Sequence, residues 1–244
     1  MSWWLLSFSR GGPARYISHL DTMRVVQRTF ARADIELALT QGMRPKPRLS
    51  LPLPLPTGAA ALDELAVVEV VEDTTPDLLG ARLKALRDAS ADGLTIERLV
   101  VTGDERPRPQ PDTAAYDCLL KAPCAAVDEV LAAFEAEPEV TIVRASPKGR
   151  KAIELKEYVC ELSASPCDAG TRLAFTLRSK ASGSARVDEV VGALAARLGI
   201  EPVVLDLTRL RVKWKGLPPR PSVAAGQIAP GGPSGPRAKG DDLQ

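Results

Sequence analysis

One order of predicted strands and helices, repeated on either side of a proline-rich segment, constrains the fold of this 244-residue chain most strongly. Residues 102–113 read TGDERPRPQPDT, with three prolines among charges of both signs. Such a composition interrupts regular structure and is typical of a stiff linker. The sequence therefore predicts two domains, over residues 1–103 and 114–215, joined by a linker over residues 104–113.

The first half alternates β-prone apolar runs with amphipathic helical periodicity. Ser18 is placed to cap the first helix, with Asp21 in the capping-box position. The predicted elements are strands over residues 3–8, 37–39, 65–71 and 94–101, and helices over residues 18–33 and 75–89. This β-α-β-β-α-β order is that of a split, ferredoxin-like arrangement.

The second half repeats the order. It is predicted to contain strands over residues 116–122, 140–143, 153–162, 173–177 and 203–215, helices over residues 123–136 and 187–198, and a turn over residues 148–150. Gly199 suits the C-cap of the last helix. We therefore predict an α+β fold of two tandem ferredoxin-like (βαββαβ) domains. Residues 216–244 are rich in Pro, Gly and Ser and poor in bulky apolar residues, so they are expected to be disordered.

Four cysteines and one histidine limit the metal chemistry of the chain. A single histidine, His19, cannot form a multi-histidine zinc or iron site. Neither Cys118 with Cys124 nor Cys160 with Cys167 forms a C-x-x-C zinc motif, and no C-x-x-x-C-x-x-C triplet is present to hold the cluster of a radical enzyme. No metal or cofactor is therefore expected, and catalysis by this chain itself is not favoured.

Hydropathy argues against contact with a membrane. No apolar run approaches the ~18 residues of a membrane span. The run Trp3–Leu6 is too short for a signal-peptide core and has no charged lead, so a cytoplasmic protein is expected.

The formal net charge of +1 conceals two segments of opposite sign. Residues 1–50 hold eight basic and three acidic groups, and residues 51–100 hold nine acidic and four basic groups. Binding of an oligoanion depends on local charge rather than on the sum. The basic segment is therefore either a surface for RNA or phosphate, including Arg15 and Arg24, or a solvated arginine stripe.

Residues 40–58, TQGMRPKPRLSLPLPLPTG, form a predicted loop with two parts. In the basic part, Gly42 permits a positive φ, and Pro45 and Pro47 hold the neighbouring cations Arg44, Lys46 and Arg48 in an extended geometry. A pre-formed anion clamp is one interpretation, because little entropy is left to lose on binding. In the second part, leucines alternate with prolines, which indicates an edge segment or polyproline II.

His19 lies at the predicted start of the first helix. A helix N-terminus disfavours imidazolium, so His19 could act as a neutral base, with Tyr16 or an arginine assisting a phosphate reaction. It could equally position a ligand, or only pack the helix start.

The last predicted strand alternates cleanly along residues 208–215. Arg209, Arg211, Lys213 and Lys215 are expected on one face, and Leu210, Val212 and Trp214 on the other. The cationic face suggests either a phosphate track or an edge strand protected by its charge. Because exposed aromatic residues are scarce, recognition of RNA by base stacking is not supported.

The stretch RYISHLDTMRVVQRTFARADIELALTQGMRPKPRLSLPLPLPTG, residues 15–58, resembles the bacterial radical SAM-associated (radical SAM-linked) protein family, whose pattern reads RYISHLDLMR…RA…PLAYSQGFNPHPRISFALPLPLG. KGRKAIELKEYV, residues 148–159, is similar to a second segment of that family. The resemblance covers roughly residues 3–215, and the Ala- and Arg-rich composition is similar to that of actinobacterial members. The chain departs from the family at Met43-Arg44-Pro45-Lys46-Pro47, where Phe-Asn-Pro-His-Pro is usual. A weaker likeness, at the level of the fold, is to the RAMP superfamily of RNA-processing proteins.

The resemblance implies a separate partner, because family members are encoded beside, or fused to, a cobalamin-binding radical SAM enzyme. The leading hypothesis is an accessory protein that binds RNA for this enzyme, in RNA modification or processing, through Arg15, His19, Arg24, Arg44, Lys46, Arg48, Arg209, Arg211 and Lys213. One alternative is a metal-independent endoribonuclease of RAMP type that uses His19 and Tyr16. Another is a protein-interaction scaffold that docks its partner through the acidic residues 51–100.

Overall fold

The structure is a computed structural model that describes residues 1–72, 76–147, 149–201 and 205–217. The predicted disorder of residues 216–244 lies outside the described residues, apart from its first two positions. Among the described helices, none combines the length and the apolar character that a bilayer crossing requires.

The first half contains β1 (Ser2–Arg10), the short 3-10 helix η1 (Gly12–Tyr16), α1 (His19–Arg32), β2 (Leu49–Ser50), β3 (Ala60–Val70), α2 (Pro76–Asp88) and β4 (Leu94–Gly103). β1 lies between β3 and β4 and is antiparallel to both, and β2 is antiparallel to β3. The predicted cap of α1 is confirmed, since the Asp21 N–H donates to Ser18 Oγ at 3.1 Å. The strand predicted over residues 37–39 is wrong: Leu37 and Leu39 form only isolated bridges, and the paired strand is β2.

The second half contains β5 (Gln110–Leu120), α3 (Cys124–Ala136), β6 (Thr141–Ser146), β7 (Gly149–Glu154), the 3-10 helix η2 (Leu155–Glu157), β8 (Val159–Cys167), β9 (Gly170–Lys180), β10 (Gly183–Ser184), α4 (Val187–Leu198) and β11 (Leu205–Lys215). Its strands lie in the order β8-β9-β5-β11, with antiparallel pairing throughout. The predicted αL cap of α4 is confirmed, with Gly199 at φ 65°.

Two boundaries in the second half differ from the prediction. The single strand expected over residues 153–162 is divided by η2, so β7 pairs only with β6 in a small separate sheet, and β8 joins the main sheet. β5 begins at Gln110, four residues inside the expected linker, because this end of the strand pairs with the C-terminal end of β11.

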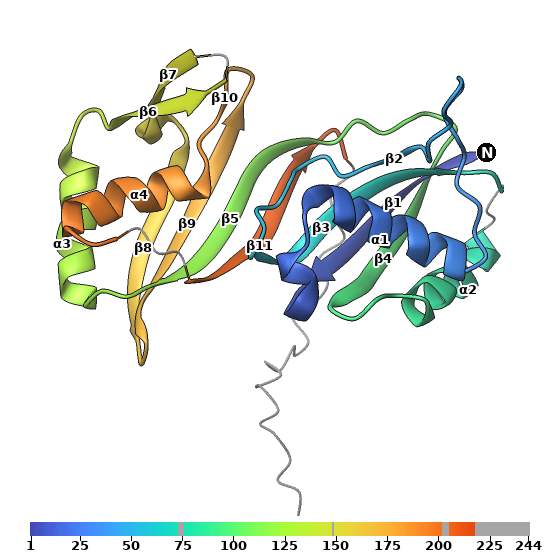
Figure 1. The fold of residues 1–244 in the computed structure, drawn as a ribbon, viewed down its shortest axis with the longest axis horizontal. Coiled ribbons are helices and arrows are strands. Elements are labelled where there is room, and N and C mark those ends of the chain that lie inside the picture. The colour runs from blue at the N-terminus through green and yellow to red at the C-terminus, as the bar shows by residue number, and fades with distance from the viewer. Residues whose placement is uncertain (73–75, 148, 202–204, 218–244) are drawn as a thin grey trace, which may run out of the picture.

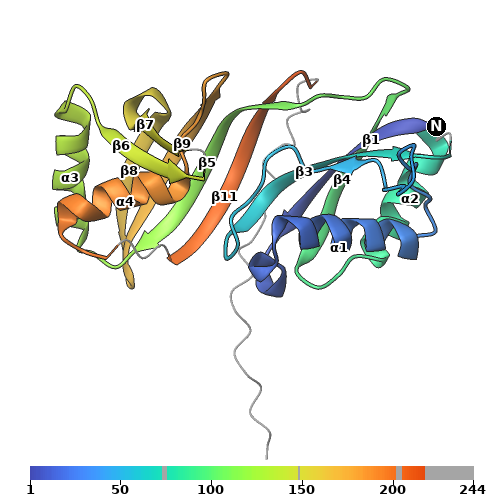
Figure 2. The ribbon, with the colours of Figure 1, turned by 45° about the horizontal axis from the view of Figure 1, so that its top comes forward.

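A short parallel contact joins the two halves into one nine-stranded sheet. β11 lies beside the start of β3, with Thr208 opposite Ala60 and Arg209 opposite Ala61. Figures 1 and 2 show the helices of both halves on the same side of this sheet, with β11 at the joint. Within the residues that the structure describes, the opposite side of the sheet carries no helix.

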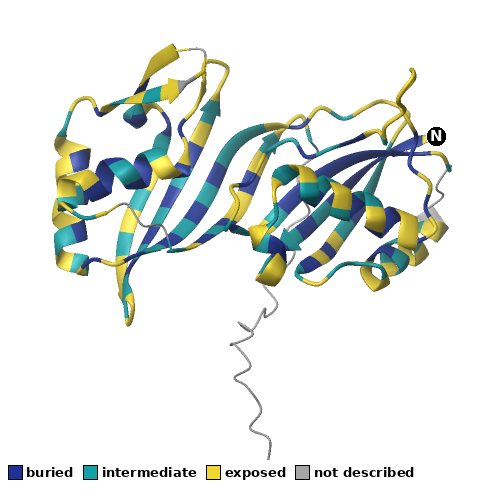
Figure 3. Ribbon diagram, in the orientation of Figure 1, coloured by how far each residue is buried: buried dark blue, intermediate teal, exposed yellow. Residues whose placement is uncertain are grey.

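The two halves differ in burial along their strands: Figure 3 shows β1 and β3 buried along most of their length, whereas buried and less buried residues alternate along β5 and β9. In the first half the helix-free side is apolar and buried around Trp3, Leu5 and Val67, against which Trp214 packs. The helix-covered core of the same half holds Trp4, Phe8 and Phe30 and the other side chains of alternate strand positions. β1 and β3 are therefore buried on both faces, whereas β5 and β9 keep one face partly open.

Candidate nucleic-acid interface

Two fully buried arginines hold the leucine–proline segment, residues 51–58, against the sheet. Arg209 donates to the carbonyl oxygens of Leu53 at 2.9 Å and Pro54 at 3.1 Å. Arg10 donates to the carbonyl oxygens of Pro56 and Ala59, both at 3.1 Å. An irregular segment that is partly buried must find partners for its buried carbonyl groups outside a β-ladder, and the guanidinium groups supply them. Residues 51–58, the leucine–proline strap, are thus a structural segment that the two arginines hold in place.

Glu64 on β3 balances the charge of this arginine pair. Its carboxylate accepts hydrogen bonds from Arg209 at 2.9 Å from Nε and at 2.5 and 2.6 Å from Nη2. Burial is the largest single effect and opposes the charge of Arg209, but the fields and hydrogen bonds of Glu64 and Tyr116 together outweigh it and raise the pKa of the guanidinium. At Arg10, burial prevails and lowers the pKa. The ion pair therefore joins β11 of the second half to β3 of the first.

The prediction that Arg209 shares an exposed cationic face with Arg211 and Lys213 is wrong, since only 1% of Arg209 is exposed. The register of β11 against β5 shifts between Arg209 and Arg211. Such a bulge adds one residue to one strand and reverses the alternation beyond it. Arg209 therefore faces the helix-covered core, whereas Arg211 and Lys213 are exposed on the helix-free side.

Arg15 also holds the leucine–proline strap in place. Its Nε donates to the carbonyl oxygen of Gly58 at 2.7 Å, and the Gly58 N–H donates back to the Arg15 carbonyl oxygen at 2.7 Å. A longer contact of 3.4 Å links Arg15 to Asp206. Tyr16 beside it is 67% exposed, with the Arg15 guanidinium 5.7 Å from the centre of its ring. Arg15 thus has a structural role that the sequence pattern did not indicate.

His19 is half-buried and is the first residue of α1. Within the described residues, its ring has no hydrogen-bond or ion-pair partner. The neighbouring Asp21 is already engaged, by Ser18 Oγ at 2.7 Å and by Arg24 at 2.7 Å. These hydrogen bonds, from Ser18 first and then from Arg24, hold the pKa of Asp21 below its ordinary value. The geometry around His19 thus shows no activating partner for a general base.

The basic loop, residues 40–48, is held at its base like a small hairpin. The Thr40 N–H donates to the Lys46 carbonyl oxygen at 2.8 Å, and the Lys46 N–H donates to Thr40 Oγ1 at 3.0 Å. At the tip, Gly42 has φ 123°, a conformation that side chains rarely adopt. Arg44, Pro45 and Lys46 are exposed, and within the described residues neither cation has a hydrogen-bond or ion-pair partner.

Arg48 differs from the two cations at the tip. It forms an ion pair with the buried carboxylate of Glu69, and its guanidinium lies 5.3 Å from the centre of the Trp3 ring. Arg106 lies at the same distance from that ring. Arg48 therefore anchors the loop to β1 and β3.

The predicted site residues do not form one cluster. His19 begins α1 and the basic loop lies beyond its other end, about 20 Å away by the rise of a 14-residue helix. Pro47 at the base of the loop lines an open groove of about 780 Å³ together with Arg28 of α1. The groove also contains Asp34 and Glu36. The loop therefore meets the C-terminal half of α1, away from Arg15 and His19.

Four of the nine acidic groups over residues 51–100 form ion pairs within the fold. Ion pairs join Glu64 to Arg209, Glu69 to Arg48, Glu72 to Arg82 and Asp88 to Lys84. The segment thus offers fewer free carboxylates than its composition indicates.

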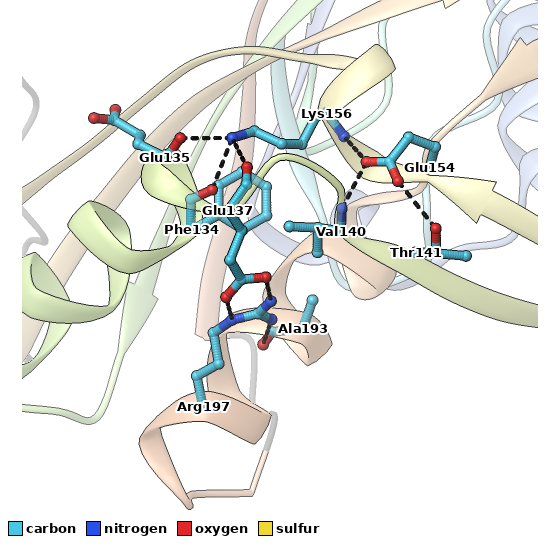
Figure 4. Close-up of polar contacts among 9 residues, drawn as sticks. All are labelled: Phe134, Glu135, Glu137, Val140, Thr141, Glu154, Lys156, Ala193 and Arg197. Atoms are coloured by element: carbon cyan, nitrogen blue, oxygen red, sulfur yellow. Dashed lines mark hydrogen bonds and ion pairs between the residues drawn. The ribbon is translucent and has the colours of Figure 1, made fainter.

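The second motif, residues 148–159, fastens its hairpin to the end of α3 (Figure 4). Lys156 Nζ donates to the carbonyl oxygens of Phe134, Glu135 and Glu137 at 2.9, 2.7 and 2.6 Å. These carbonyl groups belong to the last turn of the helix and to its C-cap residue, Glu137, and they have no intrahelical donors. Glu154 accepts from the backbone N–H groups of Val140 at 2.9 Å and of Lys156 at 3.0 Å. This motif is therefore structural.

The cysteines and acids form no metal site among the described residues. Cys118 is buried, and burial raises the pKa of its thiol to about 12. Cys160 is exposed on β8.

Residues 4–187 match a protein family described as "Uncharacterized protein conserved in bacteria (DUF2344)". The chain belongs to this bacterial family. The DUF2344 match includes the basic loop, the leucine–proline strap and the second motif, and it ends at the first residue of α4. β11, with Arg209, Arg211 and Lys213, lies beyond it.

Two further comparisons add little to the assignment of the family. No curated protein matches the chain. A chain of a solved structure titled "Crystal Structure of a Cbf5-Nop10-Gar1 Complex" is similar over 86% of this chain and 48% of that chain, with 12% identity and a TM-score of 0.49. This chain thus spans about half the length of that one, and the similarity is too low to support an argument.

Proposed function

We propose that the chain is an RNA-binding accessory protein for a separate cobalamin-dependent radical SAM enzyme, acting in RNA modification or processing in the cytoplasm. The resemblance of residues 15–58 and 148–159 to radical SAM-associated proteins supports the proposal that the partner is a radical SAM enzyme. The cysteine spacings agree with a division of labour, since the cluster for radical chemistry would belong to the other chain.

RNA binding is supported by the exposure of Arg44 and Lys46, whose cationic groups have no hydrogen-bond or ion-pair partner within the described residues. Arg15, Arg24, Arg48 and other basic residues are engaged by carbonyl groups or carboxylates of the fold. Arg44 and Lys46, by contrast, project from a loop whose base is hydrogen-bonded and whose backbone is restricted by Pro45 and Pro47. A rigid loop with free cations loses little entropy when it binds phosphate groups, which is how proteins position nucleic acids.

The proposal includes a finer description of the fold. The order β4-β1-β3-β2 in the first half and β8-β9-β5-β11 in the second supports two ferredoxin-like units over residues 1–103 and 114–215. In this description the β6–β7 hairpin is an insertion in the second unit.

The direct test is the affinity of the purified protein for fluorescein-labelled RNA. Arg44→Glu/Lys46→Glu should weaken binding at least tenfold at ~100 mM salt, and each lost phosphate contact should reduce the salt slope of log K by about 0.7. Lys84→Glu/Lys121→Glu is the matched control, because both lysines are exposed and belong to other parts of the fold, α2 and the residue after β5. Absence of RNA binding by the wild-type protein would refute the proposal.

The partner is tested separately, by affinity purification from a native host with and without RNase. Recovery of a radical SAM enzyme with the wild-type chain is expected. Recovery that survives RNase but fails for a variant of the acidic segment would instead favour the scaffold, and recovery of no such enzyme would refute this part of the proposal.

A further inference from the structure

The helix-free side of the second half carries a second set of free cations. Arg178 of β9 and Arg211 and Lys213 of β11 line one open groove of about 440 Å³. Within the described part of the chain, the side chains of these three residues have no hydrogen-bond or ion-pair partner. By contrast, Arg172 on β9 and Lys215 on β11 are paired with Asp117 and Asp112.

Strand register places the three cations in two adjacent cross-strand rows. Arg178 is opposite Thr113 of β5, and Thr113 is in turn opposite Lys213. The next row along the strands contains Thr176, Ala115 and Arg211. With strands about 4.8 Å apart and about 3.4 Å per residue, Arg178 and Lys213 lie on backbones about 10 Å apart, and the rows are about 7 Å apart. The cations therefore surround a floor of threonine and alanine side chains.

The electrostatic balance of the groove is positive. Glu161 is the carboxylate that lines it, and its Oε2 accepts a hydrogen bond from Thr176 Oγ1 at 2.8 Å. At the rim, the hydrogen bond from Lys215, aided by the fields of Lys215, Arg178 and Lys213, lowers the pKa of Asp112 against the opposing effect of burial. Three cations thus face one engaged carboxylate.

The groove also lacks what base recognition requires. Leu210 is the large apolar side chain in its lining, and no aromatic ring is among the described residues that line it. Stacking on aromatic rings is the usual means by which proteins hold unpaired bases. Contacts to phosphate and sugar groups, from guanidinium, ammonium and hydroxyl groups, are what these residues can make.

We propose that this groove, formed by β9, β5 and β11, binds the sugar–phosphate backbone of a single RNA strand without base specificity. The inference rests on the proposed function for the identity of the ligand, and its site is separate from the basic loop: the groove adds Arg178 of β9 to Arg211 and Lys213, and it lies on the side of the sheet opposite the α1 helix that adjoins the loop. An RNA held at both places would pass around the protein.

The test compares Arg178→Gln/Arg211→Gln/Lys213→Gln with a control, Lys84→Gln/Lys121→Gln/Arg150→Gln, that carries the same charge change at exposed sites elsewhere. Affinity for a labelled unstructured RNA is measured across a salt titration, and thermal unfolding confirms that both variants fold. The groove variant should bind at least tenfold more weakly than the control, with a salt slope smaller by about 2, the sum of three contacts of about 0.7 each.

The outcomes separate this inference from the proposed function. If the Arg44→Glu/Lys46→Glu variant loses RNA binding and the groove variant matches its control, the groove is refuted and the function stands. If the groove variant alone loses binding, the groove is supported and the role of the loop is refuted. If inorganic polyphosphate competes as strongly as RNA of equal charge, the groove is a general phosphate site and its assignment to RNA is refuted.

Discussion

Replacing Arg209 by methionine should destabilise the whole fold, because this side chain joins the two halves of the sheet. The substitution keeps an unbranched, apolar stem but shortens the side chain, and it removes the ion pair with Glu64 and the hydrogen bonds to the carbonyl oxygens of Leu53 and Pro54. Glu64 is 5% exposed, so its carboxylate would remain buried without its main partner. Arg10 cannot replace Arg209, since its Nη atoms are bonded to Thr22 and to the strap.

The expected magnitude follows from these contacts. Breaking a buried ion pair by removing one partner costs about 3–5 kcal/mol. Each of the two strap carbonyl groups adds about 0.5–1.5 kcal/mol. A loss of about 4–8 kcal/mol in the free energy of unfolding is therefore expected, against a total of about 5–15 kcal/mol for a typical protein.

Urea denaturation followed by circular dichroism measures this loss. Arg211→Met is the control on the same strand, and should change the free energy of unfolding by no more than about 0.5 kcal/mol because Arg211 is exposed. Arg209→Met/Glu64→Gln should recover part of the stability lost in the single variant, because it removes the orphaned charge. A cost below about 1 kcal/mol for Arg209→Met would show that the joint is not structural.

Three further predictions concern the second half. Lys156→Met should lower the free energy of unfolding by about 1–3 kcal/mol, since the last carbonyl groups of α3 lose their donor; an unchanged urea midpoint would contradict this. In the native protein a maleimide should modify Cys160 but not Cys118, whose buried thiol has its pKa raised to about 12, as peptide mass spectrometry would show; early modification of Cys118 would contradict its burial. Burial opposes the charge of Glu189, but hydrogen bonds, the first from Arg144, outweigh it and hold its pKa below the ordinary value. A carboxylate whose pKa is lower in the folded state stabilises the fold at pH values above its unfolded-state pKa, and this stabilisation is lost as pH falls through the folded-state pKa. Glu189→Gln should therefore flatten the pH dependence of the free energy of unfolding between about pH 5 and pH 2. An unaltered profile would show that Glu189 makes no such contribution.

Elements with strong local signals could be predicted from the sequence. The cap at Ser18, the αL glycine at Gly199 and the periodicity of α1, α3 and α4 depend on contacts within a few residues, and the structure has them. The division of residues 153–162 by η2, which separates β7 from β8, could not be predicted in the same way. It depends on Glu154 and Lys156 reaching the end of α3 and the residues that follow it.

The candidate site shows the same limit. Composition identified the basic residues but not their partners, because an ion pair such as Arg48 with Glu69 joins residues far apart in the chain. The groove cation Arg178 was missed altogether. A signal for it exists only once β9 is placed beside β5 and β11, since the three cations come from strands separated in sequence.

The sequence by itself determined the order of the helices and of the main strands, the absence of a cluster-binding cysteine motif and the rigid basic loop at Gly42–Pro47, since each depends on local backbone chemistry or on composition. Only the tertiary structure decided which arginines are free. The bulge after Arg209 turned one cation of an apparently uniform face into the buried joint of the sheet, and it left Arg211 and Lys213 in solvent. The physical reason is that a buried charge requires a partner, and the partner of Arg209 lies 145 residues away in the chain.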